Sequence, residues 1–123
     1  MATILIVDDD LVIRKQLRVW LEDAGHKVQD AAGGDEGIRL LHESEIDLLI
    51  IDIMMPDKGG IETLMELHRD FPRLKIIVIS GFAPTEADSF KILTRRFGAS
   101  RVFSKPLDRP VFLDAVGALL AGA

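Results

Sequence analysis

Polar residues that could do chemistry stand at the ends of the apolar runs of this sequence. They are Asp8 and Asp9, Asp52, Ser80 and Lys105. Carboxylates bind hard divalent cations through oxygen, a hydroxyl can donate a hydrogen bond, and an ammonium group compensates negative charge. Because the chain has no cysteine, any metal here would be held by oxygen ligands, which favours Mg²⁺.

Asp52 raises the sharpest question. It follows an apolar run that reads as a strand buried on both faces, where a lone carboxylate is costly to desolvate. Pro56 and Gly59 signal a loop, so Asp52 is expected where the chain opens towards solvent. Taken alone, such an aspartate is more typical of a turn or a cap than of a catalytic group.

Taken together, these polar residues indicate phosphoryl chemistry. Crowded carboxylates repel one another unless a cation compensates them. Asp52 could then accept a phosphoryl group as an acyl phosphate, with Mg²⁺ and Lys105 balancing the charge and Ser80 bonding a phosphoryl oxygen. Gly81 would leave the backbone open to the incoming group.

The elements that must position these residues alternate in type. Short apolar runs predict strands at residues 3–7, 27–31, 47–51, 75–79 and 101–104. Helical periodicity predicts a first helix with an apolar stripe from Ile13 to Ala24, ended by Gly25, and further helices at 35–43, 60–69, 84–97 and 108–121. This alternation predicts a doubly wound parallel sheet with helices on both faces and ligands at the carboxyl ends of its strands.

Two helices carry further expectations. On the first, the charged residues are expected to face away from the apolar stripe; they are Arg14, Lys15, Arg18 and Glu22. On the last, capped by Asp108, the stripe is expected in the core; it comprises Leu113, Val116, Leu119 and Leu120. The three histidines, His26, His42 and His68, are expected at surface or boundary positions because they lack metal-ligand spacing.

Composition narrows the class of protein. A chain of 123 residues, 48% hydrophobic and 28% charged, suits a single globular domain. A formal charge of -5 argues against direct nucleic-acid binding. No apolar stretch approaches the roughly 20 residues that span a bilayer, so a cytoplasmic location without membrane attachment is expected.

The motifs ILIVDD, DLLIIDIMMPDKGGIE and IIVISG, followed by Lys105 and Pro106, resemble the receiver domains of two-component response regulators. The resemblance covers the whole chain and implies one receiver domain over residues 1–123 without an output domain. It implies a flavodoxin-like (βα)5 fold with strand order 2-1-3-4-5. It also implies a phosphorelay role, with phosphate donated by a histidine kinase or a histidine phosphotransfer protein.

The same resemblance implies roles for individual residues. Asp52 would be the phosphoacceptor, and Mg²⁺ would be held by Asp8, Asp9, Asp52 and the backbone carbonyl of Met54. Ser80, Gly81 and Lys105 would bind the phosphoryl group, with a cis bond before Pro106. The chain would modify only itself and would not be an enzyme with an outside product.

The sequence departs from the family pattern at the position of an aromatic switch residue, which is Val102 here. Strand alternation directs the neighbouring Phe103 to the opposite face of the sheet. Met54 and Phe82 would flank the path of attacking water, and since neither is polar, slow hydrolysis of the phosphorylated form is expected. Simple packing of both residues against the loops remains an equal alternative.

A basic group of residues, Lys91, Arg95, Arg96 and Arg101, is the expected face for a downstream partner, although a merely solvated face is equally plausible. The protein would be a monomer or a weak phosphorylation-dependent dimer.

Three other functions compete with the signalling role. They are a degenerate receiver that binds partners without phosphorylation, an aspartate-based phosphatase, which the apolar Met54 disfavours, and a flavodoxin-like electron carrier.

Overall fold

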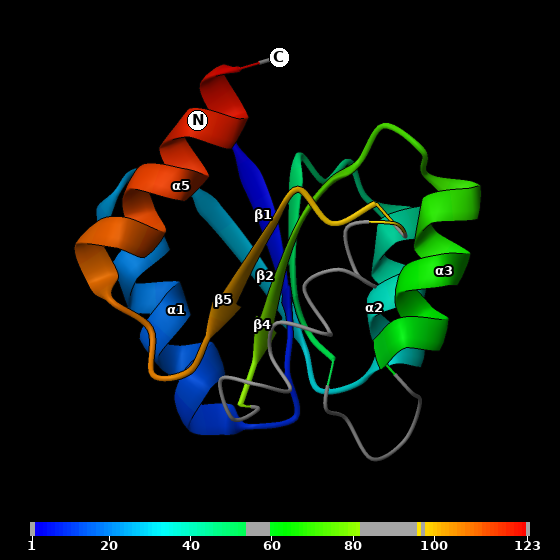
Figure 1. Ribbon diagram of the computed structural model, residues 1–123, viewed down its shortest axis with the longest axis horizontal. Coiled ribbons are helices and arrows are strands. Elements are labelled where there is room, and N and C mark those ends of the chain that lie inside the picture. The colour runs from blue at the N-terminus through cyan, green and yellow to red at the C-terminus, as the bar shows by residue number, and fades with distance from the viewer. Residues whose placement is uncertain (1, 54–59, 82–95, 97, 123) are drawn as a thin grey trace.

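The computed structural model describes residues 2–53, 60–81, 96 and 98–122, and it forms three layers (Figure 1). The strands are β1 (Thr3–Val7), β2 (Lys27–Ala31), β3 (Leu48–Asp52), β4 (Lys75–Ser80) and β5 (Arg101–Ser104). The helices are α1 (Leu11–Asp23), α2 (Gly34–Glu43), α3 (Gly60–Asp70) and α5 (Arg109–Ala121). Most of the helix expected at 84–97 lies outside the described residues.

The strands form one parallel sheet in the order β2-β1-β3-β4-β5. This confirms the predicted fold class and strand order. Three strand boundaries differ from the prediction by one residue: β3 begins at Leu48 and ends at Asp52, and β4 ends at Ser80. The Asp52 and Ser80 side chains therefore take the alternating directions of a strand instead of those of a loop.

Each face of the sheet buries its own apolar core. Helices α2 and α3 cover one face, and α1 and α5 cover the other (Figure 1). Val102 packs into the α2 and α3 side, and Phe103 into the α1 and α5 side, as strand alternation predicts. The predicted apolar stripe of α5 is confirmed, with Val116 buried and its other members packed against the same core.

The ends of α1 and α5 follow from local chemistry. The Asp10 carboxylate accepts a hydrogen bond from the Val12 N–H at 2.9 Å, and Asp108 caps α5 in the same way. Gly25 follows the last turn of α1 with a φ of 95°, a conformation that glycine adopts without strain. Among the described residues, none of the helices has the length and apolar character that crossing a bilayer requires.

One expectation about α1 is wrong. Lys15 and Glu22 are exposed, but Arg14 and Arg18 are half-buried and reach the Asp30 carboxylate on β2. Helical periodicity assigns each side chain a direction, but it carries no information on which strand lies beneath the helix. Since β2 lies under α1 in the folded chain, Asp30 supplies a partner for both guanidinium groups.

Candidate functional site

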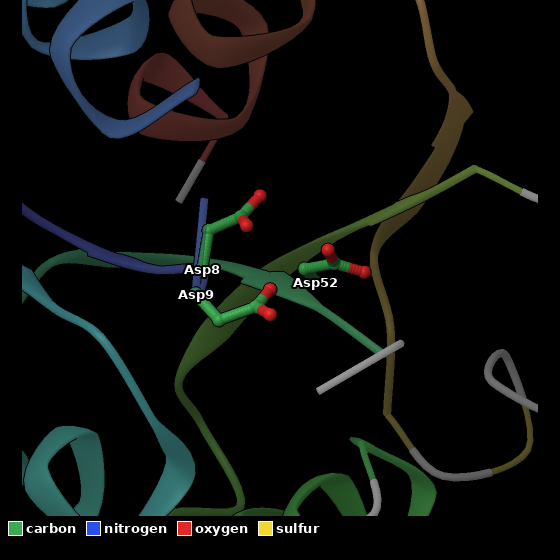
Figure 2. A group of neighbouring side chains, drawn as sticks. All are labelled: Asp8, Asp9 and Asp52. Atoms are coloured by element: carbon green, nitrogen blue, oxygen red, sulfur yellow. The ribbon is translucent and has the colours of Figure 1, made fainter. Parts of the chain in front are cut away.

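Three carboxylates meet at the carboxyl ends of β1 and β3. Asp8 and Asp9 follow β1, and Asp52 ends the neighbouring β3, where Val7 pairs with Ile51. One oxygen from each carboxylate lies within 4.8 Å of the others (Figure 2). The parallel pairing of two adjacent strands therefore brings together residues that are more than forty positions apart in the sequence.

Lys105 joins this cluster from the loop after β5. Its Nζ donates to Asp8 Oδ2 at 3.1 Å and to Asp52 Oδ2 at 2.9 Å. The Lys105 N–H donates to the Ser80 carbonyl at 2.7 Å, which ties this loop to the end of β4. The peptide bond between Lys105 and Pro106 is cis, as the resemblance implies.

Burial sets the electrostatics of the site. Asp8 is 0% exposed and Asp52 only 3%. Burial raises the pKa of Asp8, and the charge of Asp52 raises it further, although hydrogen bonds from the Asp10 N–H and from Lys105 oppose the shift. For Lys105, burial acts to lower the pKa, but the hydrogen bonds and charges of Asp52 and Asp8 outweigh it and raise the pKa.

The donor set fits Mg²⁺. Ionised, the three carboxylates carry more negative charge than the single Lys105 ammonium compensates, so a divalent cation would balance the cluster. All the side-chain donors are oxygens, which hard cations prefer. Asp9 is exposed while Asp8 and Asp52 are buried, and this leaves one side open to water, several molecules of which Mg²⁺ usually keeps.

Ser80 ends β4, the strand next to β3, and Gly81 follows it. Asp52 pairs with Ile79, so Ser80 is one residue beyond the partner of Asp52, and it is buried. Gly81 is exposed, and a Cβ added to it would meet no heavy atom of the described residues within 4 Å. Among the described residues, therefore, nothing crowds the backbone at Gly81.

Several residues expected to act lie elsewhere or outside the described residues. Met54, Phe82, Lys91 and Arg95 are outside them. Val102 is half-buried in a core, and Arg96 and Arg101 are exposed, with the Arg101 guanidinium 5.2 Å from the centre of the Phe103 ring. The surface or boundary positions expected for the histidines are confirmed: His42 and His68 are exposed, and His26 is half-buried.

Sequence reasoning missed one residue at the edge of the site. Arg14 of α1 donates from Nη1 to the backbone carbonyl of Asp8 at 2.6 Å. Its spacing from Asp8 carries no signal, because the contact depends on how α1 is rotated above β1 and β2.

Comparisons with known proteins agree with this geometry. The model of the response regulator receiver domain family matches residues 4–117. Protein PilH of Pseudomonas aeruginosa is 34% identical over 122 residues, which cover 99% of this chain and 100% of that protein. The CAI-1 autoinducer sensor kinase/phosphatase CqsS of Vibrio cholerae is 33% identical over 94% of this chain, which spans only 17% of that longer protein.

Solved structures show the same fold. A CheY-like response regulator receiver domain protein from Methanospirillum hungatei has a TM-score of 0.91 and 30% identity, with 99% of this chain and 95% of that chain covered. The response regulator protein TrrA from Thermotoga maritima, solved in complex with Mg²⁺ and BeF, has a TM-score of 0.85 and 28% identity, with 97% and 99% covered. The family match over nearly the whole chain and the relative that it spans end to end show that this chain belongs to the response regulator receiver domains of two-component signalling.

Proposed function

We propose that this receiver domain accepts a phosphoryl group on Asp52, with Mg²⁺ held by Asp8, Asp9, Asp52 and the Met54 carbonyl. The observation that carries the proposal is the convergence of the three carboxylates within 4.8 Å, with the Lys105 ammonium bonded to two of them. This complete set of acidic and ammonium groups at one sheet edge weighs against a degenerate receiver. The chain would catalyse only its own modification.

The chemistry follows from the positions of these groups. An Asp52 oxygen attacks phosphorus, forming the acyl phosphate, while the bond from phosphorus to the donor breaks and its electron pair leaves with the donor. Lys105 already bonds Asp52 Oδ2 at 2.9 Å, so its ammonium is in reach of an oxygen on a group attached there. The Ser80 hydroxyl would bond another such oxygen, and the open backbone at Gly81 would admit the group. Bound Mg²⁺ would supply positive charge against the phosphoryl oxygens.

Relatives support the cation and the donor. TrrA was solved with Mg²⁺ and BeF, and the fit of the acidic cluster to Mg²⁺ extends that chemistry to this chain. Sensor kinases such as CqsS are among the relatives, which supports a histidine kinase or histidine phosphotransfer protein as the donor. The output partner would bind the basic face that includes Arg96 and Arg101, both exposed, with Lys91 and Arg95. The domain would act in the cytoplasm as a monomer or weak dimer.

The phosphorylated form would be long-lived, because Met54 and Phe82 offer no polar group to orient attacking water. The decay of the phosphorylated protein should therefore be faster in Met54→Asn than in the wild type. Equal decay rates would contradict this part of the proposal, and Met54→Leu is the matched control.

The acceptor is tested by incubating the protein with acetyl phosphate, with and without Mg²⁺, and measuring the intact mass. The wild type should gain one phosphoryl group in a Mg²⁺-dependent way, and Asp52→Asn should gain none. Asp47→Asn is the matched control, since Asp47 directly precedes the amino end of β3, is exposed and should leave the modification intact. A mass gain in Asp52→Asn equal to that of the wild type would place the acceptor elsewhere. Absence of any gain in the wild type would favour the degenerate receiver.

A further inference from the structure

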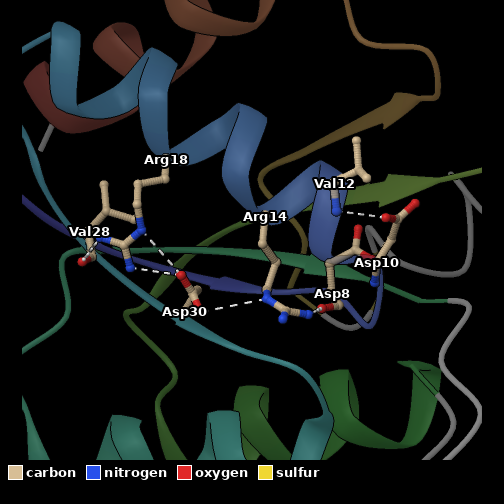
Figure 3. A network of polar contacts seen from close by, with 7 residues as sticks. All are labelled: Asp8, Asp10, Val12, Arg14, Arg18, Val28 and Asp30. Atoms are coloured by element: carbon tan, nitrogen blue, oxygen red, sulfur yellow. Dashed lines mark hydrogen bonds and ion pairs between the residues drawn. The ribbon is translucent and has the colours of Figure 1, made fainter.

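Arg14 connects helix α1 to the main chain of the acidic site. Its Nη1 donates to the Asp8 carbonyl at 2.6 Å, and its Nε lies 3.6 Å from Asp30 Oδ1 on β2 (Figure 3). The Arg14 side chain is only 13% exposed. A half-buried guanidinium therefore joins α1, β2 and the end of β1 at a single point.

The bond to the Asp8 carbonyl matters because of the peptide unit to which this carbonyl belongs. The carbonyl of Asp8 and the N–H of Asp9 share one rigid plane. Holding the carbonyl oxygen consequently sets the direction in which the chain leaves Asp8 and enters Asp9. Both residues contribute to the acidic cluster, so a rotation of this plane would move two of its three carboxylates.

Asp8 is bonded at each of its polar atoms, and Arg14 supplies one of these bonds. The Asp8 N–H donates to the Ala31 carbonyl at 3.1 Å, Oδ1 accepts from the Asp10 N–H at 2.8 Å, and Oδ2 accepts from Lys105 at 3.1 Å. The carbonyl bond from Arg14 completes the set. These bonds hold the Asp8 carboxylate in one orientation before any cation arrives.

Arg18 offers a comparison within the same network. It donates from Nη2 to Asp30 Oδ2 at 2.7 Å and from Nη1 to the Val28 carbonyl at 3.0 Å. It thus shares Asp30 with Arg14, but none of its hydrogen bonds to described residues reaches Asp8 (Figure 3). Any effect particular to the carbonyl contact should therefore be seen for Arg14 and not for Arg18.

We propose that Arg14 is a positioning residue for the cation site, which orients the peptide between Asp8 and Asp9 so that the acidic cluster is preformed. This inference rests on the proposed function, in which that cluster holds Mg²⁺. Electrostatics alone predicts the opposite effect of removing Arg14, since a guanidinium cation close to the cluster repels a second cation. The sign of the change in Mg²⁺ affinity therefore separates positioning from simple charge.

Mg²⁺ binding to the unphosphorylated protein, measured by titration calorimetry, tests the inference. Loss of an outer residue that orients a metal ligand typically weakens binding by about 10–100-fold, so Arg14→Met should weaken Mg²⁺ binding by about tenfold or more. Arg18→Met should leave the affinity within about twofold of the wild type. Arg14→Lys should bind more tightly than Arg14→Met, because its ammonium keeps one donor for the Asp8 carbonyl.

A second measurement needs no metal. Amide hydrogen exchange at Asp10, whose N–H bonds Asp8 Oδ1, should be faster in Arg14→Met than in Arg18→Met in the metal-free protein. Unchanged or tighter Mg²⁺ binding in Arg14→Met, or equal weakening in Arg18→Met, would overturn the inference. If Arg14→Met did not fold, Arg14→Lys would decide in its place, with weaker binding than the wild type expected. A wild type that failed to bind Mg²⁺ would count against the proposed function, and exchange at Asp10 would then decide the role of Arg14.

Discussion

Replacing Lys105 by methionine tests how the acidic site is stabilised without a cation. Methionine keeps much of the length and apolar stem of lysine but removes the ammonium that bonds Asp8 and Asp52. Both carboxylates are almost completely buried, so neither can recover full hydration in the variant. The variant therefore leaves two buried charges without their shared partner.

The loss of unfolding free energy in Lys105→Met depends on whether one of the two carboxylates becomes protonated. Breaking a buried ion pair by removing one partner typically costs about 3–5 kcal/mol. The variant can limit this cost by protonating one carboxylate. At the ordinary aspartate pKa of 3.8, that costs about 4.4 kcal/mol at pH 7, at about 1.36 kcal/mol per pH unit. Because burial already raises the pKa of Asp8, the actual cost is lower, and we expect Lys105→Met to lose about 3 kcal/mol.

The loss should depend strongly on pH. At pH 4.5 the same protonation costs at most about 1 kcal/mol, so the difference in unfolding free energy between variant and wild type should fall to less than about a third of its value at pH 7. Urea unfolding of both proteins in metal-free buffer at the two pH values measures this difference. The control is Lys15→Met, an exposed lysine of α1, which should change the unfolding free energy by less than about 0.5 kcal/mol.

Two results would refute the reasoning. One is a loss below about 1 kcal/mol at pH 7, because it would mean that the carboxylates are hydrated without Lys105. The other is a loss of the same size at pH 4.5, since it would assign the effect to lost packing instead of charge. Adding Asp8→Asn to Lys105→Met should recover part of the loss, because one of the two buried charges is then absent.

Three further changes have defined outcomes. Asp8→Asn should raise the unfolding free energy of the metal-free protein at pH 7. Burial raises the pKa of Asp8, so the stability that the protonated Asp8 carboxyl contributes is complete below pH 3.8 and is lost as pH rises through the raised pKa. The gain in unfolding free energy of Asp8→Asn over the wild type, measured in urea titrations, should therefore vanish towards pH 3.8. Gly37→Ala should lower the free energy of unfolding, because the added Cβ would lie 2.7 Å from Val7 Cγ2 and such overpacking costs about 1–3 kcal/mol. This cost should exceed the helix preference of alanine over glycine, which is about 1 kcal/mol. Phe112→Ala should lose about 3–5 kcal/mol in urea unfolding, since Phe112 is fully buried against the Phe103 and Trp20 rings.

Each of these changes has its own check. An Asp8→Asn advantage that stayed constant from pH 7 to pH 3.8 would exclude titration of Asp8 as its cause. Gly37→Ala should become neutral or stabilising in a Val7→Ala background, and an unchanged loss there would show that the predicted clash is absent. Phe112→Leu should lower the unfolding free energy less than Phe112→Ala, because leucine leaves a smaller cavity. Equal losses would show that leucine fills the site of Phe112 no better than alanine.

The sequence was sufficient to predict the fold and to predict which polar residues stand at the ends of the strands. Strands such as β1 and β3 are short apolar runs, and α1 has helical periodicity that Gly25 ends. These signals are local, because they depend on backbone geometry and on burial averaged over a few residues. Since parallel strands end at one edge of a sheet, the gathering of Asp8, Asp52 and Lys105 followed from the same signals.

Only the tertiary structure decided how these groups bond and which neighbours support them. Lys105, after β5, bonds both Asp8 and Asp52, and Arg14 turns inward to the Asp8 carbonyl. These contacts depend on helix rotation and on the spacing between layers. The direction of the Asp8 pKa shift likewise depends on a desolvation that no sequence window contains. Contacts between separate elements have no period in the chain, because packing over the whole domain sets them.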